Sequence, residues 1–283
     1  MEVIRTKSEL KSILQRRRKE QSRIGFVPTM GYLHSGHTSL INEAAAVSDV
    51  TVVSIFVNPL QFGEGEDFTT YPRDEDHDQR EARKAGADIL FLPSPEEMYP
   101  SPMRFNLHVQ EGADVLCGAS RPGHFDGVAT VVMKLFQLVT PDAAFFGQKD
   151  AQQAALITNM VEDFDIDTRI HVIPTIREED GLAESSRNVR LLPEEREEAP
   201  QIYRILNEGA SLAEKDGPWT AESWMQDAFQ ALSGELDYAE IRSYPSLKRE
   251  QDRTMIAAAA LKYKHVRLID NVIWNTDQRR ETE

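Results

Sequence analysis

The sequence predicts an α/β fold: a Rossmann-like parallel sheet flanked by helices, with a smaller C-terminal α+β domain. Strand-like and helix-like segments alternate through the first 176 residues, as expected for βαβ units that build a parallel sheet. Residues 51–57 are a β-branched apolar run, typical of a strand buried on both faces. The alternation ends after about Ile176, so we expect one domain over residues 1–176 and a second over residues 177–283.

The elements follow from local patterns. Thr6 and Glu9 have the spacing of a capping box, which predicts a helix to about Glu20. Short apolar runs predict strands at residues 24–27, 51–57, 88–92, 143–146 and 170–174. Helical periodicity or charged amphipathic patterns predict helices at residues 38–47, 74–85, 128–139 and 150–161. The second domain is expected to hold helices from Pro193 and over 220–232, with an antiparallel sheet of residues 238–241, 255–261 and 266–269.

Composition narrows the class of partner. Thirty-two basic and 47 acidic residues give a net charge of −15, and an acidic surface repels nucleic acid and anionic membranes. We therefore expect neither as a partner. The single cysteine, Cys117, excludes an intrachain disulfide. The N-terminus lacks the apolar core of a signal peptide and no apolar run has membrane-spanning length, so we expect a cytoplasmic protein.

The most informative segment is Pro28–His37, which follows the strand at residues 24–27 and precedes the helix at 38–47. It places His34 and His37, with two glycines, where a strand ends and a helix begins. Such a junction offers unpaired backbone N–H groups and the positive end of a helix dipole, which together favour phosphate. Imidazoles there can donate hydrogen bonds or positive charge to a transferring phosphoryl group.

Other junctions carry polar groups that suit the same chemistry. Asn58 and Gln61 follow the second strand, and Gly147–Gln153 adds a lysine, an acid and glutamines at a later strand-to-helix junction. Residues 180–188 supply hydroxyls and an arginine. No P-loop, nucleophile elbow or H-E-x-x-H site is present. A structural zinc at His34 and His37 is a less favoured alternative, because neither has an obvious third ligand nearby.

These segments, with Tyr71–Arg73, Arg121–Val132 and Arg267–Asn271, resemble the pantothenate synthetase family (pantoate–β-alanine ligase, AMP-forming) of the nucleotidylyltransferase superfamily. The resemblance implies an enzyme of pantothenate biosynthesis that uses ATP as a substrate with Mg²⁺ and acts as a homodimer. The carboxylate of pantoate would attack the α-phosphate of ATP and release pyrophosphate. The amine of β-alanine would then attack the pantoyl adenylate and release AMP. This route needs positioning, charge stabilisation and exclusion of water rather than an enzyme nucleophile.

The resemblance also implies roles for individual residues. His34, His37, Lys149 and Arg187 would be the catalytic groups, with His37 as the family's proton donor. Whether His37 transfers a proton or only stabilises charge stays open, as do the protein ligands of the metal. The ATP-binding set would be Met30, Gly31, Tyr32, Leu33, His34, Ser35, Gly36, His37, Gly147, Gln148, Lys149, Asp150, Ile176, Glu184, Ser185, Ser186 and Arg187. Gln61 would bind pantoate and β-alanine, Gln153 would bind pantoate, and Asn58 would be a further contact.

Three residues need separate expectations. Glu184 stands where the family commonly has Met or Leu, so we expect its carboxylate to point away from the triphosphate and only its backbone to touch ATP. Asp78 could assist Mg²⁺ through water, but a solvated helix face is the favoured interpretation. His124 is expected to hold the turn before its helix. The alternatives to this function are a nucleotidylyltransferase that activates another hydroxy acid and a nucleotide sensor without catalysis; the acidity and the lack of a recognition domain disfavour a tRNA synthetase.

Overall fold

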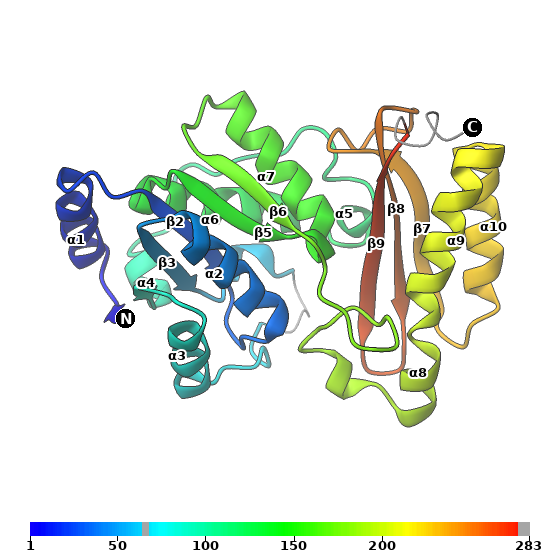
Figure 1. Cartoon of the computed structure of the whole chain (residues 1–283), viewed down its shortest axis with the longest axis horizontal. Helices are drawn as coiled ribbons and strands as arrows, with labels where there is room; N and C mark the ends of the chain where they lie inside the picture. The colour runs from blue at the N-terminus through cyan, green and yellow to red at the C-terminus, as the bar shows by residue number, and fades with distance from the viewer. Residues whose placement is uncertain (64–67, 277–283) are drawn as a thin grey trace. The chain divides into compact units, whose positions relative to one another are not determined.

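Six parallel strands form the larger sheet. The computed structural model describes residues 1–63 and 68–276, and its strands lie in the order β1-β4-β3-β2-β5-β6. Figure 1 labels four of them, β2, β3, β5 and β6. They are Glu2–Ile4 (β1), Ile24–Thr29 (β2), Val50–Ile55 (β3), Ile89–Phe91 (β4), Ala143–Gly147 (β5) and Arg169–Ile173 (β6). The chain runs outward from β2 through β3 to β4 and then returns to the other side of β2 with β5. The switch point where ligands bind in such sheets therefore lies between the carboxyl ends of β2 and β5.

Helices flank this sheet and bury its apolar side chains. The longer ones are Lys7–Lys19 (α1), Ser35–Val47 (α2), Glu75–Lys84 (α3), His124–Val139 (α6) and Ala151–Asp163 (α7). Pro95–Met98 (α4) is a short helix of the same unit, whereas the short helix Cys117–Ser120 (α5) groups with the second unit described below. Helix α2 packs against β2, β3 and β5, and α6 packs against β2 and α1. The side chains of Phe26, Val52, Leu90 and Phe145 are completely or almost completely buried in this core.

Three antiparallel strands and three helices form the second core. The strands are Glu235–Ser243 (β7), Thr254–Lys262 (β8) and Arg267–Asn275 (β9), with β8 in the centre. The helices are Pro193–Glu198 (α8), Gln201–Asp216 (α9) and Pro218–Gln230 (α10). Helices α9 and α10 pack on each other and on the strands (Figure 1). Their buried side chains include Leu206 and Phe229, which contribute to one cluster with Ile241 and Leu261.

The chain divides into two compact units. The first comprises Met1–Gln110, Arg121–Gly147 and Ile157–Pro174, and the second comprises Glu111–Ser120, Gln148–Leu156 and the chain from Thr175 onward. Two segments before residue 176 thus group with the second unit. One reason is Gln152, whose side-chain amide donates hydrogen bonds to the carbonyls of Gly112 at 2.8 Å and Val115 at 2.7 Å.

The predicted fold class is confirmed, and the differences lie at element ends and in short elements that were not predicted. Helix α2 begins at Ser35 rather than Thr38, and α6 begins at His124 rather than Val128. In both, the first turn consists mainly of polar residues and glycine, so apolar periodicity misses it. Strand β1 was not predicted, because three residues that include a glutamate give no pattern. Among residues 1–63 and 68–276, no helix is long and apolar enough to cross a membrane.

Candidate active site

The junction between β2 and α2 is organised by its two histidines. His34 is the N-cap of α2, and its Nδ1 accepts the N–H of Gly36 at 3.2 Å. The Nδ1 of His37 accepts the N–H of His34 at 3.4 Å, and the ring centroids lie 4.2 Å apart. Each imidazole thus caps a backbone donor of the first helical turn, a role usually taken by serine or aspartate. The two rings are held at the end of the helix that favours anions.

This capping also fixes where the rings carry hydrogen. A neutral imidazole has one donor and one acceptor nitrogen. Because Nδ1 of His34 and of His37 each accepts a backbone N–H, the neutral ring carries its hydrogen on Nε2. Both histidines are therefore arranged as Nε2–H donors, the form that can hydrogen-bond a phosphate oxygen.

Helix α3 holds the loop that leads to this histidine pair. The carboxylate of Asp78 accepts the N–H of Tyr32 at 2.9 Å and the N–H of Leu33 at 2.7 Å, and the Nε2 of His77 lies 2.9 Å from the Leu33 carbonyl. Asp78 is only 2% exposed. The expectation of a solvated helix face was therefore wrong, because the carboxylate accepts hydrogen bonds from the backbone of a loop. In this loop Gly31 has φ +88° and Tyr32 has φ +53°. Burial raises the pKa of Asp78, although the two N–H bonds oppose that shift.

A signal for this role was present in the sequence. Asp78, Ala82 and Ala85 lie four and then three residues apart, which places them on one face of the helix. All three are buried in the structure. An acid in line with two alanines on an otherwise charged helix faces the core, where it must have hydrogen-bond partners. The partners themselves lie about 45 residues away and could not be read from local spacing.

The amides that follow β3 lie in a second network of the first unit. The amide nitrogen of Asn58 donates to Gln61 Oε1 at 3.2 Å and to the Gly127 carbonyl at 3.1 Å. Its oxygen accepts the hydroxyl of Tyr99 at 2.7 Å, and Gln61 Nε2 lies 3.0 Å from the sulfur of Met30. Asn58 and Gln61 are both buried. Burial raises the pKa of Tyr99 above its ordinary value.

Tyr99 was not among the predicted site residues, and it fixes which way the amides point. With its oxygen occupied by Tyr99, Asn58 presents its NH₂ group to the oxygen of Gln61. Gln61 then presents its own NH₂ group toward Met30. The network leaves a donor of Gln61 directed to the predicted ATP segment Met30–His37.

The start of α6 supports the backbone of Gln61. His124 accepts from Arg121 at Nε2 and donates from Nδ1 to the Gln61 carbonyl at 2.8 Å. A side chain at Gly127 would place its Cβ 2.2 Å from the Leu60 carbonyl oxygen, so only glycine permits this approach. His124 therefore has a structural role as expected, but it is the first residue of α6 rather than part of the turn before it.

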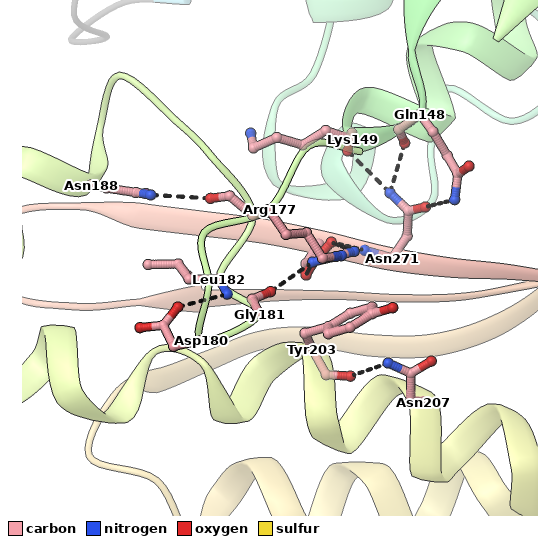
Figure 2. Close-up of polar contacts among 12 residues, drawn as sticks. Gln148, Lys149, Arg177, Asp180, Gly181, Leu182, Asn188, Tyr203, Asn207 and Asn271 are labelled. Atoms are coloured by element: carbon pink, nitrogen blue, oxygen red, sulfur yellow. Dashed lines mark hydrogen bonds and ion pairs between the residues drawn. The ribbon is translucent and has the colours of Figure 1, made fainter. Parts of the chain in front are cut away.

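The lysine segment of the second unit is held by β9. Asn271 is 3% exposed, and its amide nitrogen donates to the carbonyls of Gln148 at 2.8 Å and Lys149 at 3.1 Å (Figure 2). The side chain of Gln148 returns a hydrogen bond to Asn271 Oδ1 at 3.4 Å. These bonds fix the short 3₁₀ turn Gln148–Asp150 from which the Lys149 side chain extends.

A loop after Thr175 carries the remaining predicted ATP residues. Glu184 donates its backbone N–H to the Ile176 carbonyl at 2.9 Å, and Arg177 and Ala183 pair as an antiparallel bridge. The Ser185 hydroxyl accepts the N–H of Arg187 at 3.2 Å. The N–H of Glu184 is thus engaged within the loop, so any backbone contact of Glu184 with ATP would use another atom. The direction of its side chain stays a prediction.

Arg177 anchors this loop and was not predicted as a site residue. It forms a two-pronged ion pair with Asp270, with Nη1–Oδ2 at 2.6 Å and Nη2–Oδ1 at 3.0 Å. It also donates to the Gly181 carbonyl at 3.1 Å and stacks 3.4 Å from the ring centre of Tyr203 (Figure 2). Figure 2 shows the loop and the lysine segment meeting the same strand.

The predicted residues therefore fall into two groups. In the first unit the structure brings Met30, Gln61 and Asn58 into one network and organises the histidine loop beside it. In the second unit, Lys149 and Ser185 line one small cavity. The assignment of Gln153 to pantoate stays a prediction. Within the described part of the chain, no group of three or more His, Cys, Asp or Glu side chains is arranged to bind a metal ion.

A parallel sheet with a helix N-terminus at its switch point is the architecture of nucleotide-binding α/β proteins. Comparison with known proteins narrows this class. The model of the pantoate–β-alanine ligase family matches residues 2–273, so the chain belongs to this family. A pantothenate synthetase of Halalkalibacterium halodurans is 53% identical over 278 residues, which cover 96% of this chain and 98% of the relative. One from Listeria monocytogenes is 48% identical and covers 99% and 100% of the two chains.

Solved structures agree with the assignment. The crystal structure of pantothenate synthetase from Thermus thermophilus has a TM-score of 0.89 and 42% identity, and covers 96% of this chain and 99% of that one. Pantoate–β-alanine ligase from Francisella tularensis, whose structure is a complex with β,γ ATP and β-alanine, has a TM-score of 0.78 and 36% identity. The match covers 98% of both chains.

Proposed function

We propose that this protein condenses pantoate with β-alanine in two ATP-dependent steps, as an enzyme of pantothenate biosynthesis. Pantoate attacks the α-phosphate of ATP and forms pantoyl adenylate with release of pyrophosphate. The amine of β-alanine then attacks the acyl carbon and displaces AMP. The observation that carries the proposal is the family match over residues 2–273, which spans every ATP and substrate residue named from the sequence.

The histidine pair supports the first step. His34 and His37 each use Nδ1 as a helix cap, so each neutral ring offers Nε2–H to phosphate oxygens where charge develops. A proton donor at His37 would have to be the imidazolium, whose Nδ1–H cannot accept the N–H of His34. We therefore assign His37 the stabilisation of charge rather than proton transfer. The other proposed ATP residues of this segment are Met30–Leu33, Ser35 and Gly36, which surround the two histidines in the sequence.

The second unit supplies the other proposed ATP contacts. Lys149 and Arg187 are assigned to the phosphates as catalytic cations, with Ser185 and Ser186 beside them. The segment Gln148–Asp150 is assigned to ATP together with Gly147, the last residue of β5 in the first unit. Asp150 would accept from the ribose hydroxyls, and Ile176 is assigned to adenine. In this proposal residues 1–176 bind nucleotide and pantoate, and residues 177–283 act as the smaller lid domain.

The amides are assigned to the acid substrate. Gln61 and Gln153 orient the hydroxyls and carboxylate of pantoate without an ion pair that would weaken the nucleophile. The donor that Gln61 directs toward Met30 supports this role, and Asn58 acts by holding Gln61. Gln61 is also assigned to β-alanine, which the Francisella tularensis relative binds in its crystal structure.

Mg²⁺ does not have a protein site of its own in this proposal. No metal-binding group of acids or histidines occurs among residues 1–63 and 68–276, and both oxygens of Asp78 are occupied by backbone N–H groups. We propose that the ion enters with the triphosphate as the substrate MgATP and assign no step to it. A homodimer and a cytoplasmic location complete the proposal and rest on the family resemblance.

A product assay tests this function. The purified protein is incubated with MgATP, pantoate and β-alanine, and AMP, pyrophosphate and pantothenate are measured. We expect pyrophosphate release to need pantoate and AMP release to need both substrates. Pyrophosphate formed only with another hydroxy acid would overturn the substrate, and the absence of AMP with every acid tested would favour a nucleotide sensor.

A further inference from the structure

We infer that Asp270 and Asn271, adjacent residues of β9, position the two ATP-binding segments of the second unit relative to each other. One segment is Gln148–Asp150, the lysine segment, and the other is Glu184–Arg187, the serine loop. This inference rests on the proposed binding of ATP by those segments. Asp270 and Asn271 are positioning residues, since their side chains contact protein rather than substrate.

Asn271 fixes the lysine segment. Its amide nitrogen reaches two successive carbonyls, those of Gln148 and Lys149, at 2.8 and 3.1 Å. Two donors from one buried amide determine both the position and the tilt of the peptide that carries Lys149.

Asp270 fixes the serine loop through Arg177. The ion pair between them is largely buried, with side chains 4% and 17% exposed. Arg177 forms the bridge to Ala183, and the neighbouring Ile176 carbonyl accepts the N–H of Glu184, where the serine loop begins. The carboxylate of Asp270 also accepts the N–H of Asn271 at 2.8 Å, so the two positioning residues are bonded to each other.

The strand geometry explains why neighbours can serve two segments. Successive side chains on a strand point to opposite faces, so Asp270 and Asn271 reach in opposite directions from one backbone. Their partners in register on β8 are Ala259 and Ala258. The small cavity lined by Lys149, Ser185 and Asp270 shows that both segments meet at this strand.

Two variants and a control test the inference. Asn271→Ala removes the bonds to the lysine segment, and Arg177→Lys keeps the charge but loses the two-pronged pair with Asp270. Gln226→Ala is the matched control, because it removes a side-chain amide bond of 3.0 Å to a backbone carbonyl of β7 in the same unit. Unfolding by circular dichroism shows that each variant is folded before it is compared.

The first measurement is hydrogen exchange of the protein without substrate. We expect both test variants to increase exchange in the lysine segment and in the serine loop, while Gln226→Ala changes neither. Exchange that increases only in the segment next to the substituted residue would overturn the inference. No substrate is present in this measurement, so its outcome is independent of the product assay. Failure of the parent protein to release AMP with pantoate in that assay would overturn the proposed function, not the positioning of the two segments.

The second measurement is steady-state kinetics. We expect Asn271→Ala to raise the KM for ATP or lower kcat by about tenfold, a moderate part of the roughly 100-fold loss that a 1 Å misplacement can cause. The KM for pantoate should stay unchanged, since its predicted contacts are Gln61 and Gln153. An unchanged dependence on ATP, or an equal rise of both KM values, would contradict positioning of the ATP segments.

Discussion

The buried carboxylate of Asp78 offers the sharpest test of how the histidine loop is held. In Asp78→Asn the side chain keeps its shape, but one acceptor oxygen becomes an NH₂ donor. One of the N–H groups of Tyr32 and Leu33 then faces a donor instead of an acceptor. The loop must move to relieve this contact, and it carries His34 directly after Leu33.

The expected change in stability is small because two effects oppose each other. A hydrogen bond to a charged group contributes about 1.5–3 kcal/mol, and its loss destabilises the variant. The burial that raises the pKa of Asp78 is also a cost of the ionised parent, which asparagine does not carry, and a buried polar group costs about 1–3 kcal/mol. We therefore expect a net change within about 1 kcal/mol, or roughly 2–4 °C in Tm.

The pH dependence has a definite sign. Because the pKa of Asp78 is raised in the folded protein, its contribution to stability is present below the unfolded pKa of about 3.9 and is lost as pH rises through the folded pKa. Asparagine does not titrate. The Tm of the parent should therefore rise relative to that of Asp78→Asn as pH is lowered from 7 toward 4.

The activity should change far more than the stability. A displacement of the histidine loop by about 1 Å corresponds to a loss of roughly 100-fold in kcat/KM for ATP. Asp76→Asn is the control, since it removes the same charge from an exposed position of the same helix. Parent-like kinetics with ATP in Asp78→Asn, or a loss of activity equal to that of Asp76→Asn, would refute the reasoning.

Three further substitutions test separate parts of the site. Tyr99→Phe removes the 2.7 Å bond to Asn58, so we expect the KM for pantoate to rise about fivefold, as for one bond of about 1 kcal/mol, with an unchanged KM for ATP. An equal rise in the KM for pantoate and the KM for ATP would argue against this role of Tyr99. Lys149→Ala should abolish pantoate-dependent pyrophosphate release without changing Tm, and normal turnover by a folded variant would remove Lys149 from the mechanism. Glu184→Leu should leave ATP affinity, measured by calorimetry, nearly unchanged; a large gain would show that the carboxylate faces the triphosphate.

The parts of the fold that the sequence predicts are those with strong local patterns. The apolar β-branched run of β3 and the periodic apolar face of α6 identify themselves without reference to the rest of the chain. Strand β1 depends on pairing with β4, which lies more than 80 residues away, and three residues give no periodicity. The start of α2 was missed for a different reason. The residues that cap it, His34 and His37, are polar groups of the site and do not belong to the apolar face that identifies the helix.

The candidate site divides in the same way. His34, Lys149 and Gln61 could be named because each stands at the end of a predicted strand in a recognisable motif. The residues that hold these three in place could not be identified from the sequence. Tyr99 lies 41 residues from Asn58, and Asn271 lies 122 residues from Lys149. Local spacing contains no information about such pairs, which arise only when the tertiary structure brings buried donors and acceptors together.

The histidine pair shows how these supporting contacts limit the chemistry. From the sequence, His37 could donate a proton, stabilise charge or bind zinc. A zinc ion on Nε2 of His37 would leave the hydrogen of the neutral ring on Nδ1, and the imidazolium also carries a proton there. Either would displace the N–H of His34, and with it one cap of α2. Hydrogen bonding from Nε2 to a phosphate oxygen leaves both caps intact. Of the three roles, charge stabilisation is the one that leaves the hydrogen bonds of the helix end in place. The attack of a carboxylate on the α-phosphate needs positioning and charge stabilisation, and it does not need a proton from His37.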